Sequence, residues 1–288
     1  MELYVAYKDY EWMMNFTESL IEEIALAVCG TTEIQMGDQQ ISLKAPFKRI
    51  SMRDAILEHT GFDIADKTED QLRDICGQLN IETSPEMGSG KLIDEIFGEK
   101  CESKYINPTF ITEYPIEMSP LCKRHRTNPA LTERFELMIN GKEVANAYSE
   151  LNDPIDQRAR FEAQLALSER GDDEAMFIDQ DFLRALEYGM PPTSGIGIGM
   201  DRLVMLLTDN QSIQEVLFFP QMRPEKNVTL TELDHQILNA CSDEPAPLAA
   251  VRATIDCSNK QWDVSLKTLT KNQLLKVFKE EEVLYIKK

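Results

Sequence analysis

Two glutamates, Glu136 and Glu143, flank the dipeptide Asn140-Gly141, and their spacing could bring two carboxylates to one face of a sheet. Asn-Gly between two runs of alternating apolar residues predicts a β-hairpin with a type I′ turn. With regular pairing, Glu136 is expected opposite Ala145, on the same face as Glu143. Two carboxylates so placed are unfavourable unless water, a cation or a cationic ligand lies between them. A solvated sheet face and a cation site are therefore the two alternatives.

Three further polar side chains follow Glu143 on the second strand of this hairpin. Strict alternation would place Asn146, Tyr148 and Glu150 on the face opposite Glu143, and the hairpin would then have no apolar face to bury. We therefore expect a β-bulge between Glu143 and Asn146, a feature that redirects side chains beside functional sites. The bulge would turn all five polar groups, Glu136 included, toward one cavity.

Alternating glycines precede an arginine in the run Gly195-Ile-Gly-Ile-Gly-Met-Asp-Arg202. The run is not a dinucleotide-binding fingerprint, because Met200 stands where the pattern requires its third glycine. Alternating glycines leave one face of a strand without side chains, so that a flat ligand such as a base could lie against the backbone. Arg202 follows at the start of a predicted helix, where its charge and the free N–H groups could bind an anion. The alternative is a glycine bend with a surface arginine.

The densest basic cluster of the chain is Lys123-Arg124-His125-Arg126, just upstream of the hairpin. It could bind a polyphosphate or form a solvated loop, and both alternatives remain open. Residues Gly88-Ser-Gly-Lys91 resemble the end of a phosphate-binding loop, but Pro85 and Leu92 break that pattern, so we expect only a flexible turn.

The elements that must position these residues form a mixed α/β pattern. Alternation predicts a strand over Glu2–Ala6, and a 3.6-residue period from Asp9 to Gly30 predicts a long amphipathic helix. Residues 31–105 are expected to form an insertion of short helices. Asp153-Pro154 predicts the start of another helix that runs to about Arg170. Two more helices are expected around Asp181–Tyr188 and from about Asp201.

The composition is that of a folded, acidic protein. Its 288 residues include 30 Lys and Arg and 50 Asp and Glu, and the resulting charge of −20 argues against a free-standing nucleic-acid binder. The six cysteines form no C-x-x-C pair, which disfavours a zinc site or a disulfide framework and fits reduced thiols in the cytoplasm. No stretch approaches the ~20 apolar residues that span a bilayer, so no membrane partner is expected.

The charge changes near residues 224–227. From Val228 to the end there are eight Lys and Arg and nine Asp and Glu, so almost all of the negative charge lies before this point. We expect two domains, residues 1–227 and 228–288. The second is expected to contain three helices and a β-hairpin, in an order that resembles a winged helix: Thr231–Cys241, Pro247–Ile255, Ser258–Thr270 and Leu274–Ile286.

Several strings occur together in an order that resembles class II lysyl-tRNA synthetases: Glu2-Leu-Tyr, ERFELMINGKEVANAYSELNDP, ALEYGMPPTSG and GIGIGMDR. The resemblance covers about residues 1–225. It implies an α/β (α+β) fold, with an antiparallel sheet flanked by helices. It also implies ligation of L-lysine to tRNA(Lys) through a lysyl-adenylate, with ATP consumed and AMP and diphosphate released.

The resemblance implies a role for each candidate residue. The lysine pocket would be formed by Glu2, Tyr4, Asn146, Tyr148 and Glu150. Glu136 and Glu143 would coordinate Mg²⁺ on the ATP phosphates, and Gly197 and Gly199 would line the floor under the adenine and ribose. Arg202 would be the catalytic arginine that binds the γ-phosphate. These roles agree with the chemistry, because a desolvated ammonium requires carboxylates around it.

The chain departs from the family pattern at its start, which falls inside the second family motif. We therefore expect a C-terminal fragment of a synthetase whose parent enzyme is a homodimer, and we expect the fragment not to form lysyl-adenylate alone. Two alternatives remain. One is a paralogue that attaches lysine to a protein acceptor, and the other is a non-catalytic binding protein derived from a synthetase.

Overall fold

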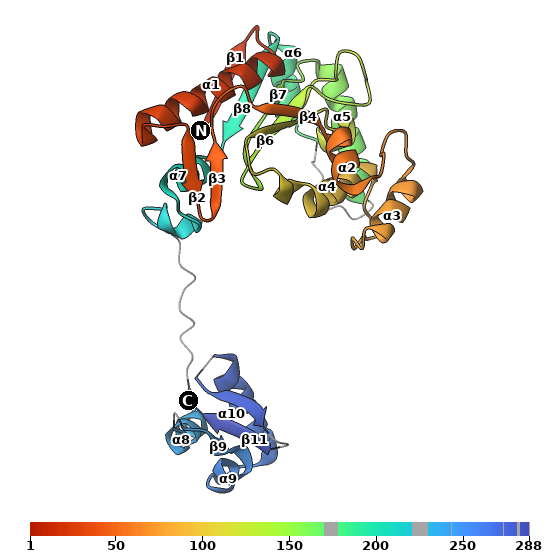
Figure 1. Cartoon of the computed structure of the whole chain (residues 1–288). Helices are drawn as coiled ribbons and strands as arrows, with labels where there is room; N and C mark the ends of the chain where they lie inside the picture. Colours follow the sequence, from red (N-terminus) through yellow and green to blue (C-terminus); the bar gives the residue numbers. More distant parts are fainter. Residues whose placement is uncertain (170–177, 221–229, 243, 273, 281–282, 288) are drawn as a thin grey trace. The chain divides into compact units, whose positions relative to one another are not determined.

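The computed structural model describes residues 1–169, 178–220, 230–242, 244–272, 274–280 and 283–287 (Figure 1). The chain divides into two compact units, Met1–Pro220 and Gln221–Lys288. The domain boundary expected between residues 227 and 228 lies outside the described residues.

The first unit is built on a six-stranded sheet (Figure 1). Its strands, in spatial order, are β1 (Glu2–Ala6), β8 (Thr193–Ile198), β7 (Lys142–Ser149), β6 (Arg134–Ile139), β5 (Thr109–Thr112) and β4 (Lys48–Ser51). All neighbours are antiparallel except β4 and β5, which are parallel. The expected antiparallel sheet flanked by helices is therefore confirmed.

Helix α1 (Tyr10–Cys29) covers one face of this sheet and packs on β6, β7 and β8. The helix begins where predicted, because the Asp9 side chain accepts a hydrogen bond from the Trp12 N–H at 3.0 Å. It ends at Gly30, whose φ of 73° is the left-handed conformation common at helix ends. Buried residues of α1 and of the sheet face beneath it form one apolar core, together with α7 (Met200–Thr208).

The insertion contains a hairpin and three helices: β2 (Glu33–Met36), β3 (Gln39–Ser42), α2 (Met52–Thr60), α3 (Glu69–Gln78) and α4 (Ser89–Lys100). The helices form a second core with Ile111 and Met138 of the sheet. The flexible turn predicted at residues 88–91 is wrong, because Gly88 caps α4 and the next residues form its first turn. The Gly90 N–H donates to the Glu117 carboxylate at 2.9 Å, which holds this turn in place.

The remaining helices of the first unit are α5 (Pro154–Glu169), α6 (Gln180–Glu187) and three short 3₁₀ turns, η1 (Glu102–Lys104), η2 (Ile116–Met118) and η3 (Ile213–Glu215). The Asp153 carboxylate accepts the N–H of Ile155 at 2.8 Å, as the predicted cap requires. None of the helices in the described ranges is long and apolar enough to cross a membrane. None of the six cysteines is joined in a disulfide.

The second unit has its own core, which includes Trp262, Leu269 and Ile286. Its elements are α8 (Glu232–Ala240), β9 (Ala246–Pro247), α9 (Leu248–Ala253), α10 (Asn259–Lys271), β10 (Lys276–Glu280) and β11 (Val283–Lys287), and its sheet order is β10-β11-β9. The three helices and the hairpin lie close to the ranges that the sequence predicts. The short strand β9 is an addition, since two residues are too few to give a periodic signal.

Replacing Phe135 with Ala is expected to lower the free energy of unfolding of the first unit by about 3–5 kcal/mol, because it leaves a cavity in a packed core. Phe135 is fully buried, and its ring meets that of Phe110 edge to face at a centroid distance of 4.9 Å. Trp12 and Trp262 are the only tryptophans, so urea unfolding followed by fluorescence in a Trp262→Phe background reports on the first unit alone.

The matched control for this core variant is Leu26→Ala, since Leu26 is half exposed on α1. Leu26→Ala should lower the free energy of unfolding by less than about 1 kcal/mol. Equal losses for Phe135→Ala and Leu26→Ala would contradict the assignment of this core.

Candidate active site

The sheet face opposite α1 carries the polar side chains in two rows that cross the strands. The first row crosses β1, β8, β7 and β6 and contains Glu2, Gly197, Asn146 and Glu136. The second row crosses the same strands and contains Tyr4, Gly195, Tyr148 and Arg134. Residues directly opposed on antiparallel strands share a face, so strands far apart in the sequence contribute to one surface.

The β-bulge predicted in β7 is present, and Val144 is its extra residue. Glu136 therefore lies opposite Asn146, and the expected pairing of Glu136 with Ala145 is wrong. The extra residue restores a single polar face, because it shifts every later side chain of β7 by one position. The Val144 carbonyl also accepts the Gly199 N–H at 2.9 Å, so the bulge anchors the start of α7.

A cavity of about 220 Å³ lies on this face. It is lined by Glu2, Tyr4, Asn146, Tyr148, Glu150, Gly195, Ile196 and Gly197. The five residues predicted to hold an amino acid are thus together in one concavity. Glu136 and Glu143 share the face but do not line this cavity, so the expectation that all five hairpin groups open into it is wrong in that respect.

Two glycines of the run on β8 have different surroundings. A Cβ on Gly195 would overlap the Glu150 Oε1 atom and would lie 2.7 Å from Tyr4 Cε1. Gly195 therefore makes room for the two side chains that converge over it. A Cβ on Gly197 would meet no atom within 4 Å, so this part of the floor is open.

The cavity holds a carboxylate that is poorly compensated. Burial, together with the nearby charge of Glu2, raises the pKa of Glu150 to about 7. The Glu150 Oε1 atom is buried and has no hydrogen-bond partner among the described residues. The Tyr4 hydroxyl donates to Glu2, and this bond together with burial raises the pKa of Tyr4 to about 12. A cation placed between these groups would satisfy Glu150 and offset the repulsion from Glu2.

Arg202 lies in the first turn of α7 beside Glu143 of the hairpin. Its Nη1 donates to the Glu143 carbonyl oxygen, and the same atom is 3.7 Å from the Glu143 carboxylate. Both side chains are partly exposed, so a ligand can reach them. The geometry brings a cation and a carboxylate together at one end of the polar face, next to Gly199.

Glu136 and Glu143 have the donor chemistry of a site for a hard divalent cation. Burial raises the pKa of Glu136, Arg134 opposes this, and the charge of Glu143 raises it again. Within the described residues, no group of three or more Asp, Glu, His or Cys is arranged to hold a metal ion by itself. Two carboxylates fit Mg²⁺, which is usually bound by one or two carboxylates together with phosphate oxygens and water.

The basic cluster Lys123–Arg126 is tied into the structure through side-chain contacts. Its contacts are Lys123 with Asn152 at 3.1 Å, Arg124 with Asp156 at 2.9 Å, His125 with Tyr10 at 3.4 Å, and Arg126 with Glu133 at 2.7 Å and Asp9 at 3.0 Å. Arg124 and Arg126 are nonetheless exposed, as the solvated-loop alternative requires, and the polyphosphate alternative stays open. The charges organise the loop, and we assign no ligand to them.

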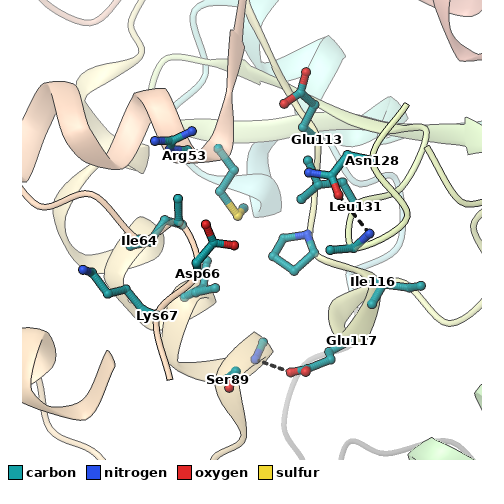
Figure 2. Close-up of a pocket in the computed structure, with 16 residues that line it drawn as sticks. Arg53, Ile64, Asp66, Lys67, Ser89, Glu113, Ile116, Glu117, Asn128 and Leu131 are labelled. Atoms are coloured by element: carbon teal, nitrogen blue, oxygen red, sulfur yellow. Dashed lines mark hydrogen bonds between the residues drawn. The ribbon is translucent and has the colours of Figure 1, made fainter. Parts of the chain in front are cut away.

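A larger cavity, of about 440 Å³, lies between α2, α4 and the loop that follows β5 (Figure 2). Its apolar wall includes Ile64, Ile93 and Ile116. Two of its charged residues are already engaged: Arg53 makes two hydrogen bonds of 2.7 Å with Asp63, and Glu117 accepts the bond from α4 drawn in Figure 2. The smaller cavity is therefore the candidate site, because its buried carboxylate has no partner in the part of the chain that the structure describes.

Sequence reasoning assigned no role to Arg134 or Gly195, which complete the second row. The signal for Arg134 was available, since it lies two positions before Glu136 on the same strand and must share its face. For Gly195 the sequence shows only a glycine run, and the contact with Glu150 depends on a pairing that the sequence does not reveal.

Comparison with known proteins adds a family and named relatives. The family model for class II tRNA synthetases (D, K and N) matches residues 1–223. Proteins named lysine–tRNA ligase are similar to this chain. The one from Christiangramia forsetii is 63% identical over 289 residues, which cover 100% of this chain and 51% of the relative.

Two other relatives with that name match a shorter part of the chain. The Porphyromonas gingivalis ATCC 33277 protein is 70% identical over 226 residues, which are 78% of this chain and 39% of that protein. The Azobacteroides pseudotrichonymphae protein is 69% identical over 226 residues, 78% of this chain and 45% of its own length. The chain thus spans about half the length, or less, of the curated relatives it matches.

Proposed function

The chain belongs to the class II tRNA synthetases of the D, K and N group, and on that basis we propose that it carries the lysine and nucleotide sites of a lysine–tRNA ligase. The reaction activates L-lysine with ATP to lysyl-adenylate and then transfers the lysyl group to tRNA(Lys), releasing AMP and diphosphate. The observation that carries the proposal is the buried Glu150 carboxylate, which faces a cavity without a partner. The names of the relatives support the same substrate.

We propose that Glu150 and Glu2 hold the side-chain ammonium of lysine, with Tyr4 and Tyr148 around it. A primary ammonium has three donors and no acceptor, so it matches carboxylate and phenol oxygens. A neutral side chain of the same length would leave Glu150 buried and unpaired, and the site would reject it.

The nucleotide is proposed to lie over Gly197 and Gly199, with Arg202 on its terminal phosphate. The open floor at Gly197 supports a base or ribose against the backbone. Glu136 and Glu143 would hold Mg²⁺, which offsets the negative charge of the ATP phosphates when it is bound. The lysine carboxylate is already ionised, so the protein needs no general base for the first step and acts by positioning and charge compensation.

The wider setting is proposed from the family resemblance and from the cysteine usage. The parent enzyme would be a homodimer that acts on tRNA(Lys) in the cytoplasm, where the six cysteine thiols would remain reduced. The order of helices and strands in the second unit supports a winged-helix-like domain over residues 228–288.

Calorimetric titration of the purified chain with lysine and with norleucine tests the proposal. Norleucine has the same four side-chain carbons but lacks the terminal ammonium group. We expect lysine to bind at least about 100-fold more tightly, because a buried charge is left unpaired with norleucine. Equal binding of the two, or no binding of lysine, would refute the proposed pocket. Lysine-dependent exchange between ATP and pyrophosphate would contradict the separate expectation that the chain forms no adenylate alone.

Lysine affinity is expected to rise with pH between about 6 and 8. The pKa of Glu150 is about 7 in the free chain, whereas an ammonium binds only its ionised form. Below this pKa a proton must leave before lysine binds, so the affinity should fall up to about tenfold per pH unit. Calorimetry in buffers of different ionisation enthalpy would measure the released proton. An affinity that is independent of pH would contradict the role of Glu150.

A further inference from the structure

Arg134, at the start of β6, lies between the proposed lysine pocket and the proposed metal carboxylates. Its Nε donates to the Asn146 Oδ1 atom at 3.2 Å, and its Nη2 donates to a carboxylate oxygen of Glu136. The Arg134 side chain is only 14% exposed. One guanidinium thus contacts a residue of each proposed site.

The guanidinium is held from its other sides as well. Nη1 donates to the Met118 carbonyl at 3.1 Å and to the Ser119 Oγ at 2.9 Å. The plane lies over the ring of the buried Tyr114, with 4.4 Å between the guanidinium carbon and the ring centroid. These contacts fix the orientation of a planar group that can only donate hydrogen bonds.

The orientation of the Asn146 amide follows from this. An asparagine amide has one accepting oxygen and one donating nitrogen, and only the oxygen can face a guanidinium. The Asn146 oxygen is therefore committed to Arg134, and its N–H groups remain for the cavity that Asn146 lines. Amide N–H groups suit a carboxylate and repel an ammonium.

Glu136 shows why this orientation needs support. It lies directly opposite Asn146 in the sheet, so its carboxylate is on the strand next to the amide. Without Arg134, the Asn146 amide could turn and donate to Glu136. Arg134 prevents this by binding the Glu136 carboxylate and the Asn146 oxygen at the same time.

We propose that Arg134 is a positioning residue that holds the Asn146 amide with its N–H groups toward the pocket, where they donate to the α-carboxylate of the bound amino acid. The inference rests on the proposed function, since it takes lysine as the ligand. It adds a residue that does not line the proposed lysine cavity. It also gives a direction for the bound lysine, with its carboxylate toward β6 and its ammonium toward Glu150.

The test compares lysine with cadaverine, which is lysine without its carboxylate. In Arg134→Lys, which keeps the charge but not the forked geometry, lysine should bind about tenfold or more weakly. Cadaverine binding should be unchanged, because it makes no contact through Asn146. The matched control is Arg124→Lys, because the ion pair of Arg124 with Asp156 lies outside the cavity. This variant should bind both lysine and cadaverine as tightly as the wild type does. An equal loss for lysine and cadaverine would indicate a structural role and overturn the proposal.

Two further measurements separate this inference from the proposed function. In an Asn146→Ala background, Arg134→Lys should cause no additional loss of lysine affinity, because the two residues act as one unit. In the ligand-free chain, the Asn146 side-chain ¹⁵N–¹H signals should change in Arg134→Lys and not in Arg124→Lys. Unchanged Asn146 signals would refute the positioning role. Absence of lysine binding in the wild type, with the Asn146 signals altered by Arg134→Lys, would refute only the proposed function.

Discussion

Glu150→Gln is expected to weaken lysine binding by about 100-fold or more at pH 8. The substitution preserves the shape of the side chain but removes the buried negative charge, so the lysine ammonium would be desolvated without its nearest counter-ion. Breaking such a buried pair typically costs about 3–5 kcal/mol. Calorimetric titration with lysine measures the loss directly, and a loss of less than about fivefold would contradict the assignment of Glu150 to the ammonium.

The same variant should make the free chain more stable at pH 8. The pKa of Glu150 is raised from 4.5 to about 7 in the folded chain, so ionisation of this group opposes folding, and stability falls as the pH rises through this interval. Glutamine does not ionise, so a higher Tm than wild type is expected at pH 8 and a smaller difference at pH 4. Stability and binding would then change in opposite directions.

The matched control is Glu58→Gln. Glu58 pairs with Lys48 at 3.3 Å, and both side chains are about half exposed. The chemical change is identical, but an exposed pair contributes little to stability. Neither lysine affinity nor the pH dependence of the Tm should differ from wild type.

Gly195→Ala is the second change with a large expected effect. The added methyl group would overlap a carboxylate oxygen of Glu150 and crowd the Tyr4 ring at 2.7 Å. Both are side chains that can rotate, so we expect the sheet to remain folded while the pocket loses its shape. A displacement of about 1 Å in a preorganised site can cost roughly 100-fold. Lysine titration and circular dichroism together would show a folded chain that no longer binds.

Gly197→Ala provides the control on the same strand. Gly197 also lines the cavity, but its Cβ would meet no protein atom within 4 Å and would displace no lining side chain, so lysine binding should fall far less than in Gly195→Ala. The methyl group would instead fill part of the open floor proposed for the nucleotide, so ATP should bind more weakly. The two glycine variants should therefore lose different ligands. If Gly195→Ala binds lysine as well as Gly197→Ala does, the pocket is not where we place it.

Local signals in the sequence predict much of the fold. The turn at Asn140-Gly141 has φ angles of 53° and 64°, as a type I′ hairpin requires. The helix caps at Asp9 and Asp153 follow from the hydrogen-bonding chemistry of those side chains. The bulge in β7 follows from the alternation of polar and apolar residues within that strand. The presence of a bulge could be inferred because a hairpin needs one apolar face, but the identity of its extra residue could not. The pairing of Glu136 with Ala145 is wrong because it assumes a ladder without the bulge.

Features that depend on distant pairings were not predictable in this way. β1, at the start of the first unit, pairs with β8, which lies near the end of that unit in the sequence. Because β8 also pairs with β7, this pairing brings Glu2 and Tyr4 to Asn146 and Glu150. The resemblance to a known family implies that these four residues share one pocket, whereas the periodicity of the sequence does not. The same holds for Arg124 and Arg134. Their partners, Asp156 and the Met118 carbonyl, belong to other segments of the chain and approach them only in the folded structure.

The extra residue Val144 matters more for what it contacts than for the pairing of its own strand. An in-frame loss of this one codon would join Glu143 to Ala145 in an unbroken ladder, and every other residue of β7 would keep its present partner and face. The loss would instead remove a buried apolar side chain and the carbonyl that accepts the Gly199 N–H. Selection on the length of this segment would therefore act through the attachment of α7, which carries Arg202, rather than through the hairpin itself.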